Sequence, residues 1–554
     1  MSFCRNPGEL SQGGKRRRIP GFLAEVRQKI RCQAGCAGFA SPCFWVALIV
    51  LLLITTSCQL LPEPPRLATA TAQAALPPTP TREPLRLPVG GNGETAVLST
   101  APPDSQPNPT LTIWVNETSP AHREALETIA AGFEESRSVN VEIVYVTPNL
   151  LPDLVETTAV SHTTALPDIL IHPIEYTMGW AEQGILNTDA AETAVNNLGR
   201  DTFNAAALDL VSAAGQAAAI PSDGYQQLLI YRTDWFDERG LDPPDNYAAM
   251  LAAAEATYDR ENLRSGFVIP TESNLRTTHE AFEQIAAANG CQLINEAGEV
   301  LLTEPACSEA INFYYSIVHQ FSPIGVQTDT SARNAYLEGR TGMIIAPPTI
   351  LPQLAGLDAA HVPTCPECSQ NLRHLAENSG IITTIFGNGD TSANFGKMVN
   401  LGITNEADVE TAVAFAEYWF NQGYEIWLAV ESERKVPMRQ GSPENPVQLF
   451  NAWGTEPLAG SNLSLTDIYG SEIVAQLKNG VTQSNRWGIP QGQGSLITNL
   501  YRELTFSVVL QEMLSGYFNT DKTIYEAYER VVELIPNYAF EVIGEPTPTP
   551  EPEA

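Results

Sequence analysis

Basic residues are scarce in this sequence. It has 31 Lys and Arg residues against 64 Asp and Glu residues, a formal net charge of −33 at pH 7. Eight of the basic residues and two of the acidic ones precede Cys58, which leaves 23 basic and 62 acidic residues after it. Because phosphate binding depends on clusters of Lys and Arg, this composition excludes nucleic acid as a partner. The acidity is typical of a solvated surface, and no stretch matches the spacing of a calcium-binding loop.

Long hydrophobic runs are also missing. The one substantial run lies in residues 44–57, FWVALIVLLLITTS, and it has about eleven consecutive apolar residues behind a basic segment. A membrane-spanning helix needs about 20, so this run is short for a span and suits the core of a signal peptide. An uncleaved anchor helix over 44–61 stays open as the alternative. Both readings place the rest of the chain outside the cytoplasmic membrane.

The sequence contains none of the catalytic motifs that spacing alone can identify. It has no nucleophile elbow, no HExxH helix and no Ser, His and Asp set. The segment HEAFEQ at His279 lacks the second histidine, and we expect His279 to lie on the surface of a helix. A catalytic pair of carboxylates stays open, because only their separation in space identifies one. The absence favours a binding protein over an enzyme, and we expect no cofactor.

Two segments rich in proline and threonine flank the part of the chain that can fold. The first follows Cys58 and continues to residue 109, and the second is the tail 544–554, GEPTPTPEPEA. Apolar periodicity is absent from both, so neither can bury a core, and the first describes a partly extended tether. The folded part is therefore about residues 110–543.

The apolar run ends in ITTSC, which resembles the lipobox of bacterial lipoproteins. In that motif small residues precede a cysteine that receives a diacylglycerol and becomes the mature amino terminus. The resemblance implies that residues 1–57 are a signal peptide with a long basic leader and that Cys58 is the site of lipid attachment.

Residues 111–189 indicate an α/β layer. The short runs LTIWV, VNVEIVYV and LPDILI predict strands, and the segment 120–133 predicts an amphipathic helix with Ser119 as its N-cap. Strands separated by a helix-length segment are typical of parallel strands with a crossover helix. Ligands bind outside the carboxyl ends of such strands, which points to residues 114–118 and 172–176.

The order of these motifs resembles the first lobe of extracellular solute-binding proteins of the family that serves carbohydrate ABC transporters. The segment 215–251 is similar to the part of that family where a turn, here 221–226, precedes a strand that crosses into a second lobe, here LLIYRTDWF. The segment 394–439 resembles the returning hinge strand and a following VP motif. At 347–350, where relatives often carry an aromatic platform, this sequence reads PPTI.

The resemblance implies an α/β, periplasmic-binding-protein-like fold: two lobes with central sheets flanked by helices, joined by a hinge of crossing strands. The expected boundaries follow from the matching segments. They are lobe 1 over 110–229, lobe 2 over 230–395, a return to lobe 1 over 396–440, and a helical part over 441–543 that belongs mainly to lobe 2.

Four of the nine cysteines lie in the part that folds, and an exported body favours disulfides between them. Three connectivities are possible. We expect the local pairs Cys291 with Cys307 and Cys365 with Cys368. A zinc site is the alternative for the second pair, because His361 and His374 bracket it; we predict no metal.

Aromatic and polar side chains stand at the expected strand ends and turns. A sugar has weakly apolar faces edged by hydroxyl groups, so its site needs flat rings together with carboxylates or amides. Each residue alone has packing as its alternative role, and the group is a hypothesis. The candidate ligand-binding residues are Trp114, Asn116, Glu117, Tyr176, Asp223, Tyr225, Asn400 and Trp427.

The sequence therefore predicts a monomeric solute-binding lipoprotein on the extracytoplasmic face of the membrane. By the resemblance, it captures a small solute, a sugar or oligosaccharide, through lobe closure and delivers it to the permease subunits of an ABC transporter. Two other functions stay open. One is a surface enzyme that acts on polysaccharide, and the other is a ligand-sensing lipoprotein without a permease.

Overall fold

The structure is a computed structural model that describes residues 108–162, 164–458 and 460–538. These residues belong to one compact unit of the chain, Ala101–Ala554. The predicted signal peptide, the lipid-attachment residue Cys58 and the tail 544–554 lie outside the described residues, as does nearly all of the tether 58–109.

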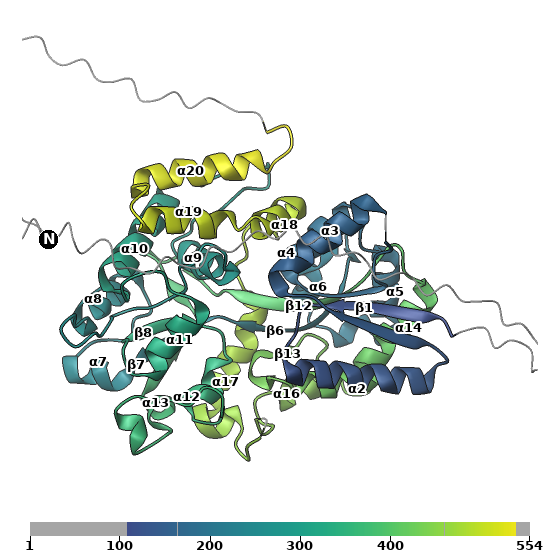
Figure 1. Cartoon of the computed structure of the whole chain (residues 1–554), viewed down its shortest axis with the longest axis horizontal. Coiled ribbons are helices and arrows are strands. Elements are labelled where there is room, and N and C mark those ends of the chain that lie inside the picture. The colour runs from purple at the N-terminus through teal and green to yellow at the C-terminus, as the bar shows by residue number, and fades with distance from the viewer. Residues whose placement is uncertain (1–107, 163, 459, 539–554) are drawn as a thin grey trace, which may run out of the picture. The chain divides into compact units, whose positions relative to one another are not determined.

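A six-stranded sheet organises the first part of the fold (Figure 1). Its strand order is β13-β6-β12-β3-β1-β2. β1 pairs in parallel with β2 and β3, whereas β12 pairs antiparallel with β3 and β6. The strands are β1 (Thr110–Val115), β2 (Asn140–Tyr145), β3 (Ile169–Pro173), β6 (Ile220–Gln226), β12 (Gly396–Ile403) and β13 (Val436–Pro437).

The predicted crossover helix is α2 (Pro120–Ser136), and the parallel strands it joins are confirmed. The Ser119 side chain caps the helix by accepting a hydrogen bond from the His122 N–H. Its apolar stripe faces the sheet because the buried positions recur every three or four residues. The stripe consists of Ala125, Leu126, Ile129, Ala130 and Phe133.

Helices cover both faces of this sheet (Figure 1). Leu111, Ile113 and Val115 pack in one hydrophobic cluster with α2, α5 and α14. Side chains of the opposite face, such as Leu170, pack with α3 and α4 in a second cluster that continues into the rest of the unit. The helices are α3 (Leu151–Ser161), α4 (Ile174–Glu182), α5 (Thr188–Leu198), α6 (Ala205–Leu210), α14 (Val409–Tyr418), α15 (Tyr424–Leu428) and α16 (Gln448–Ala452).

A three-stranded antiparallel sheet, in the order β8-β7-β9, organises the second part. Helices pack around it, and α19 and α20 lie over α9 and α10 (Figure 1). Its strands are β7 (Leu228–Arg232), β8 (Met343–Ala346) and β9 (Ser379–Ile382). The helices are α7 (Thr233–Arg239), α8 (Tyr247–Thr257), α9 (Arg276–Ala288), α10 (Pro305–Phe321), α11 (Asp329–Leu337), α12 (Ile350–Leu354), α13 (His374–Glu377), α17 (Leu465–Gly480), α18 (Gly494–Arg502), α19 (Thr505–Leu514) and α20 (Thr520–Glu533). Two further strand pairs are β4 (Ser212–Ala213) with β5 (Gln216–Ala217) and β10 (Ile385–Phe386) with β11 (Ser392–Ala393).

A single residue, Gln227, separates β6 from β7, where the chain first passes from one sheet to the other. β6 ends at Gln226 in the six-stranded sheet, and β7 begins at Leu228 in the three-stranded sheet. The prediction of a turn at 221–226 is wrong, because this segment is β6 itself. It pairs with β12 on one side and β13 on the other, and this pairing holds the segment extended despite Pro221 and Gly224. The fold class is the predicted one: α/β, with two sheets flanked by helices and strands that cross between them.

The prediction that His279 lies on a helix surface is also wrong. Its side chain is fully buried, and its ring stacks on Tyr501 of α18 with centroids 4.2 Å apart. The helix that carries it, α9, is covered by both α10 and α19. Burial from more than one side leaves little of α9 exposed, so the amphipathic pattern of its sequence does not identify an exposed face there.

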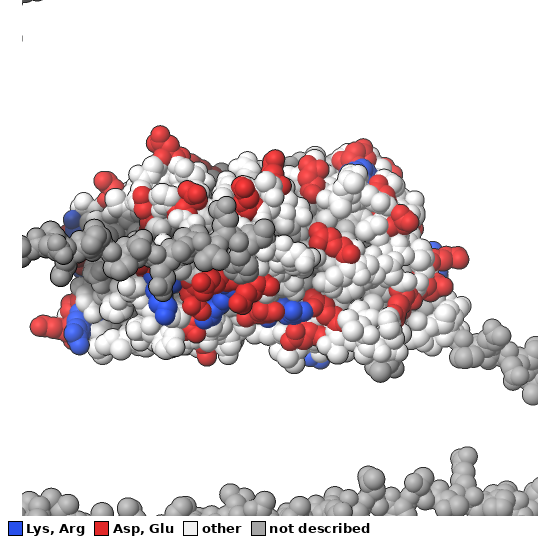
Figure 2. All heavy atoms as spheres, turned by 90° about the horizontal axis from the view of Figure 1, so that it is seen from above, with Lys and Arg blue, Asp and Glu red and all other residues white. Residues whose placement is uncertain are grey.

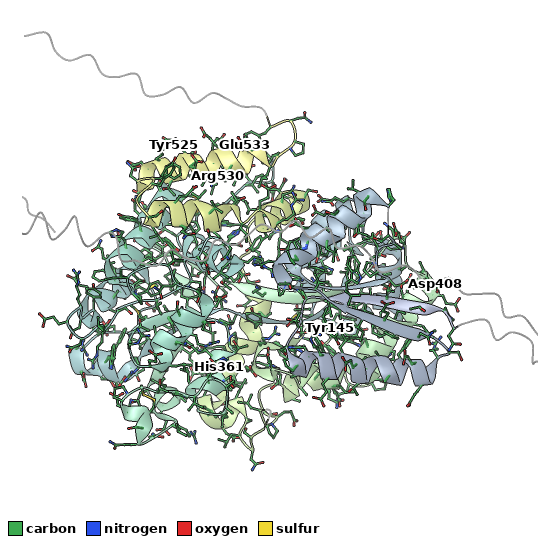
Figure 3. The ribbon with its side chains drawn as sticks, in the orientation of Figure 1. Tyr145, His361, Asp408, Tyr525, Arg530 and Glu533 are labelled. Atoms are coloured by element: carbon green, nitrogen blue, oxygen red, sulfur yellow. A yellow bond between two sulfur atoms is a disulfide. The ribbon has the colours of Figure 1, made fainter. Side chains whose placement is uncertain are left out.

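Two disulfides join the four cysteines, Cys291 with Cys307 and Cys365 with Cys368, which are the expected local pairs. The histidines near the second pair bind separate carboxylates. His361, labelled in Figure 3, contacts Asp358 at 2.7 Å, and His374 lies 3.4 Å from Asp234. Among the described residues, no three His, Cys, Asp or Glu side chains are grouped so that they could hold a metal ion.

The surface of the described unit is rich in carboxylates. Figure 2 shows one face, on which Asp and Glu side chains outnumber Lys and Arg side chains. Within residues 108–162, 164–458 and 460–538, no helix is both long enough and apolar enough to cross a membrane.

Candidate functional site

The first group of candidate residues lies just beyond the carboxyl end of β1. Glu117 is two residues past Val115, and its carboxylate accepts two hydrogen bonds from the Arg434 guanidinium, at 3.1 and 2.7 Å. Paired hydrogen bonds of this kind fix orientation as well as charge. Arg434 belongs to the 3₁₀ helix η6 (Ser432–Arg434), which immediately precedes β13.

The residue after Arg434 extends this group into the interior. Lys435 is fully buried; its ammonium donates to the Trp427 carbonyl at 2.7 Å and lies 3.5 Å from the centre of the Trp427 ring. The Trp427 indole N–H donates to Oδ2 of Asp223 at 2.7 Å. We call these five residues, Glu117, Asp223, Trp427, Arg434 and Lys435, the Arg434 cluster.

The charges of the Arg434 cluster set its protonation states. Burial opposes ionisation of Glu117, but the Arg434 guanidinium outweighs it and lowers the pKa of Glu117 to about 2. Burial lowers the pKa of Lys435 to about 8 and raises the pKa of Asp223. Burial together with the Lys435 ammonium lowers the pKa of His122, which packs beside Trp427, to about 4. Near neutral pH, Glu117 is ionised and His122 is uncharged.

A second group joins the two parts of the fold. Lys397 of β12 donates to the Glu280 carboxylate of α9 at 2.6 Å. Arg276, at the start of α9, donates to the Tyr176 hydroxyl of α4 at 3.0 Å and lies 3.7 Å from the Glu175 carboxylate. We call these five residues, Glu175, Tyr176, Arg276, Glu280 and Lys397, the Lys397 cluster.

Tyr225 lies between the two clusters. It is opposite Lys397 in the pairing of β6 with β12, and its side chain is half-buried. Burial raises the pKa of Tyr225, and both the Lys397 ammonium and the Arg434 guanidinium act against that rise. Charges of both clusters therefore act on one half-buried side chain at the junction of the two sheets.

The structure brings together five of the eight predicted residues. Glu117, Asp223 and Trp427 are in the Arg434 cluster, Tyr176 is in the Lys397 cluster, and Tyr225 lies between them. The other three are placed differently. Trp114 packs with the hydrophobic cluster on the opposite face of the sheet, Asn400 is buried with its amide donating to Thr177 at 3.0 Å, and Asn116 is half-buried beyond β1.

Sequence reasoning missed the cations of both clusters: Arg276, Lys397, Arg434 and Lys435. The composition of the chain could have pointed to these four cations. In a body with 23 basic and 62 acidic residues, a basic residue next to a predicted strand is unusual enough to examine. Arg434 and Lys435 directly precede the VP motif, and Lys397 lies in the predicted hinge strand.

A cavity of about 590 Å³ lies beside the Arg434 cluster. It is lined by residues of α15, α16 and the start of α17, and its Ser432 and Pro437 flank Arg434 and Lys435 in the sequence. None of the eight predicted residues lines this cavity. Its walls are mostly apolar, and no residue of either cluster lines it.

Comparison with known families matches residues 119–358 to the model of the family described as bacterial extracellular solute-binding protein. A curated relative, YcjN of Escherichia coli (strain K12), is named as an ABC transporter periplasmic-binding protein. It is 24% identical over 194 residues, which are 35% of this chain and 45% of the relative. The chain thus matches about half the length of this curated relative.

Solved structures share the fold over most of this chain. One is an ABC transporter solute-binding protein from Agrobacterium radiobacter K84 in complex with ribitol, with a TM-score of 0.57 and 17% identity over 77% of this chain and 99% of that one. Another is a sugar transporter protein from Arthrobacter chlorophenolicus A6 with bound laminaribiose, with a TM-score of 0.60 and 14% identity over 77% and 99%. The matched family and these structures are binding components of transporters and not enzymes.

Proposed function

We propose, from the premise that residues 119–358 belong to the bacterial extracellular solute-binding protein family, that this chain captures a small carbohydrate-like solute outside the cell and delivers it to an ABC permease. The proposal includes anchoring through a lipid on Cys58 and the tether that follows it. It includes no catalytic step and no cofactor.

The observation that carries the proposal is the meeting of charged side chains from both parts of the fold around Tyr225. Lys397 comes from the six-stranded sheet, whereas Glu280 and Arg276 come from α9, which packs within the second part. A site built from two bodies is complete only when they are together. Buried charges and hydroxyls that converge on one partly exposed ring provide the polar groups that a solute site requires.

The physical basis is differential binding. A solute that contacts groups on both parts of the fold gains all of its interactions only in the closed arrangement, so binding shifts the population toward that arrangement. The solved structures with ribitol and laminaribiose support a hydroxyl-rich solute for this chain. The permease and the hydrolysis of ATP belong to partner subunits in this proposal.

A thermal-shift screen of the full-length chain, purified in detergent, tests the proposal. The panel contains sugars, polyols, peptides, polyamines and divalent metal ions. We expect a sugar or polyol to raise the unfolding temperature in a concentration-dependent way, because a ligand that binds only the folded state stabilises it by mass action. A response confined to peptides, polyamines or metals, or no response at all, would contradict carbohydrate capture.

The same screen on a Tyr225→Ala variant tests whether the solute binds at Tyr225. Tyr225 is half-buried, and the variant removes the ring at which the two clusters meet. We expect the carbohydrate response to be lost while the unliganded unfolding temperature changes little. A full response in this variant would place the solute elsewhere.

A further inference from the structure

We infer that the solute is a small, uncharged polyhydroxy compound of monosaccharide size or an acyclic polyol, held by hydrogen bonds to carboxylates, and not a long stacked oligosaccharide or an acidic sugar. The inference rests on the proposed function and specifies its substrate class. It is carried by three observations: the faces of the candidate aromatic rings, the pairing of the cations, and the buried acceptors that have no donor.

The aromatic rings expected to stack on a sugar are already in contact with protein groups. Trp427 is fully buried between the Lys435 ammonium, 3.5 Å from its ring centre, and the rings of Trp419 and His122. Tyr176 is fully buried and stacks on Trp180 with ring centres 5.1 Å apart. A long oligosaccharide needs a series of free ring faces, and neither of these rings offers one.

The remaining two candidate rings are each half-buried. Trp114 packs against the hydrophobic cluster that also contains Tyr176. Tyr225 is partly exposed at the junction of the clusters. One partly exposed ring suffices for a single sugar unit, and an acyclic polyol needs none.

Each cation of the two clusters already has an acceptor within the protein. Arg434 binds Glu117 through two hydrogen bonds, and Lys397 binds Glu280 at 2.6 Å. Lys435 donates to the Trp427 carbonyl, and Arg276 donates to the Tyr176 hydroxyl. A carboxylate or phosphate on the solute would have to compete with Glu117 for Arg434 or with Glu280 for Lys397, which is costly because it leaves a buried charge unpaired.

Within the two clusters, the buried side-chain atoms without a hydrogen-bond partner are all acceptors. Both carboxylate oxygens of Glu175 and Oδ1 of Asp223 are buried without a hydrogen-bond partner, and these side chains are only 2% and 1% exposed. Buried acceptors without donors cost free energy, and a solute hydroxyl placed against them removes that cost. The two carboxylates belong to different clusters, and a solute with several hydroxyl groups has a donor for each.

Isothermal titration of the full-length wild-type chain in detergent with three compounds tests the inference. D-Mannitol is an uncharged acyclic polyol, D-gluconate is an acyclic six-carbon compound that carries a carboxylate, and maltotriose is a neutral oligosaccharide. We expect D-mannitol to bind at least about tenfold more tightly than either of the others. Because the unaltered protein is used, the result does not depend on a variant folding.

The outcomes separate this inference from the proposed function. Tighter binding of maltotriose or D-gluconate than of D-mannitol would overturn the small-polyol class and leave carbohydrate capture standing. No binding of any of the three, together with no response to sugars or polyols in the thermal-shift screen, would overturn both.

A Glu175→Gln variant distinguishes a role of Glu175 in solute recognition from a role in packing alone. The amide keeps the size of the side chain but removes its charge, so we expect affinity for D-mannitol to fall about tenfold and the preference over D-gluconate to shrink. Glu255→Gln, an exposed change on α8, is the matched control and should alter neither. Equal losses for both compounds in the Glu175→Gln variant would overturn the assignment of Glu175 to solute recognition.

Discussion

At the residue scale, the pair of Glu117 and Arg434 shows how much this site depends on paired charge. The two side chains are 19% and 11% exposed, so water screens them little. Removing one partner of a buried pair leaves the other charge uncompensated, which is more costly than never having had the pair. We therefore expect Arg434→Met to destabilise the protein by about 3 kcal/mol near neutral pH, at the lower end of the usual range, measured as a shift of the urea unfolding midpoint.

The pH dependence of that destabilisation follows from the pKa of Glu117, which Arg434 holds at about 2 against an ordinary value of 4.5. A carboxyl whose pKa is lowered on folding contributes stability that is present above about 4.5 and is lost as the pH falls toward about 2. The difference between wild type and Arg434→Met should therefore shrink across that interval. Arg434→Lys, which keeps the charge but not the paired geometry, should lie between them. A difference that is constant with pH would contradict the pairing.

Lys435 makes a prediction of the same sign on the alkaline side. Burial lowers its pKa from 10.5 to about 8, so the unfolded chain binds more protons than the folded one between these values. Its contribution to stability is complete above about 10.5 and is lost as the pH falls through about 8. Lys435→Met removes this dependence, so the stability of the variant relative to wild type should decrease from pH 8 to pH 10.5. Paired urea titrations at pH 7, 8, 9 and 10 measure it, and a flat difference would count against the burial of Lys435.

These residues also show why the candidate site could be predicted only in part. Glu117 was found because it follows a strand, and strand ends are visible as local patterns. Asp223 was found through the family resemblance of 221–226, which is a strand and not the predicted turn. Their partners are not local. Arg434 lies 317 positions from Glu117, and Trp427 lies 204 positions from Asp223. The burial of Tyr176 and Trp427 likewise depends on neighbours from other segments, so the sequence could identify these rings but not whether their faces are free.

At the element scale, the contact between α4 and α18 is governed by two glycines. A Cβ at Gly179 would lie 2.2 Å from Oγ1 of Thr498 and 2.9 Å from the Gly494 carbonyl. The helices approach this closely because neither carries a side chain at the crossing, and Glu182 accepts two hydrogen bonds from Ser495 beside it. This approach brings α4, with Glu175 and Tyr176, toward the second part of the fold.

Gly179→Ala should therefore separate α4 from α18. Overpacking costs about 1–3 kcal/mol, and we expect a loss of thermal stability together with weaker solute binding, because Glu175 and Tyr176 shift with the helix. Gly389→Ala is the matched control, since nothing lies within 4 Å of a Cβ there. Differential scanning calorimetry and titration of both variants measure the effects. Gly179→Ala behaving like Gly389→Ala would show that the close contact is not needed.

The elements themselves were largely predictable, because α2 and the parallel strands beside it have clear periodicity and an N-cap. The exceptions have physical reasons. The segment 221–226 contains proline and glycine, which indicate a turn, but its pairing with β12 and β13 keeps it extended. His279 is buried because both α10 and α19 pack on α9. The apolar periodicity of a single helix does not predict that a second helix packs on its other side.

At the scale of the whole described unit, two features join the two parts of the fold. Gln227 is the single residue between β6 and β7, and the pair of Lys397 with Glu280 joins the six-stranded sheet to α9. The Glu280 side chain is 3% exposed and that of Lys397 is 20% exposed. Burial opposes ionisation of both groups, yet their attraction lowers the pKa of Glu280 and raises that of Lys397. This ion pair therefore favours the arrangement in which the two parts are in contact.

Small-angle scattering with and without solute tests this coupling. We expect saturating solute to reduce the radius of gyration of the wild-type chain, because binding favours the closed arrangement.

Lys397→Gln leaves Glu280 buried without its partner, so this variant should be more open without solute, bind about tenfold more weakly, and need more solute for the same contraction. The double variant Lys397→Gln with Glu280→Gln removes the unpaired charge and should recover part of the affinity. Wild-type scattering that stays unchanged with bound solute would contradict capture by closure, and a double variant as impaired as Lys397→Gln would show that the unpaired charge is not the cause.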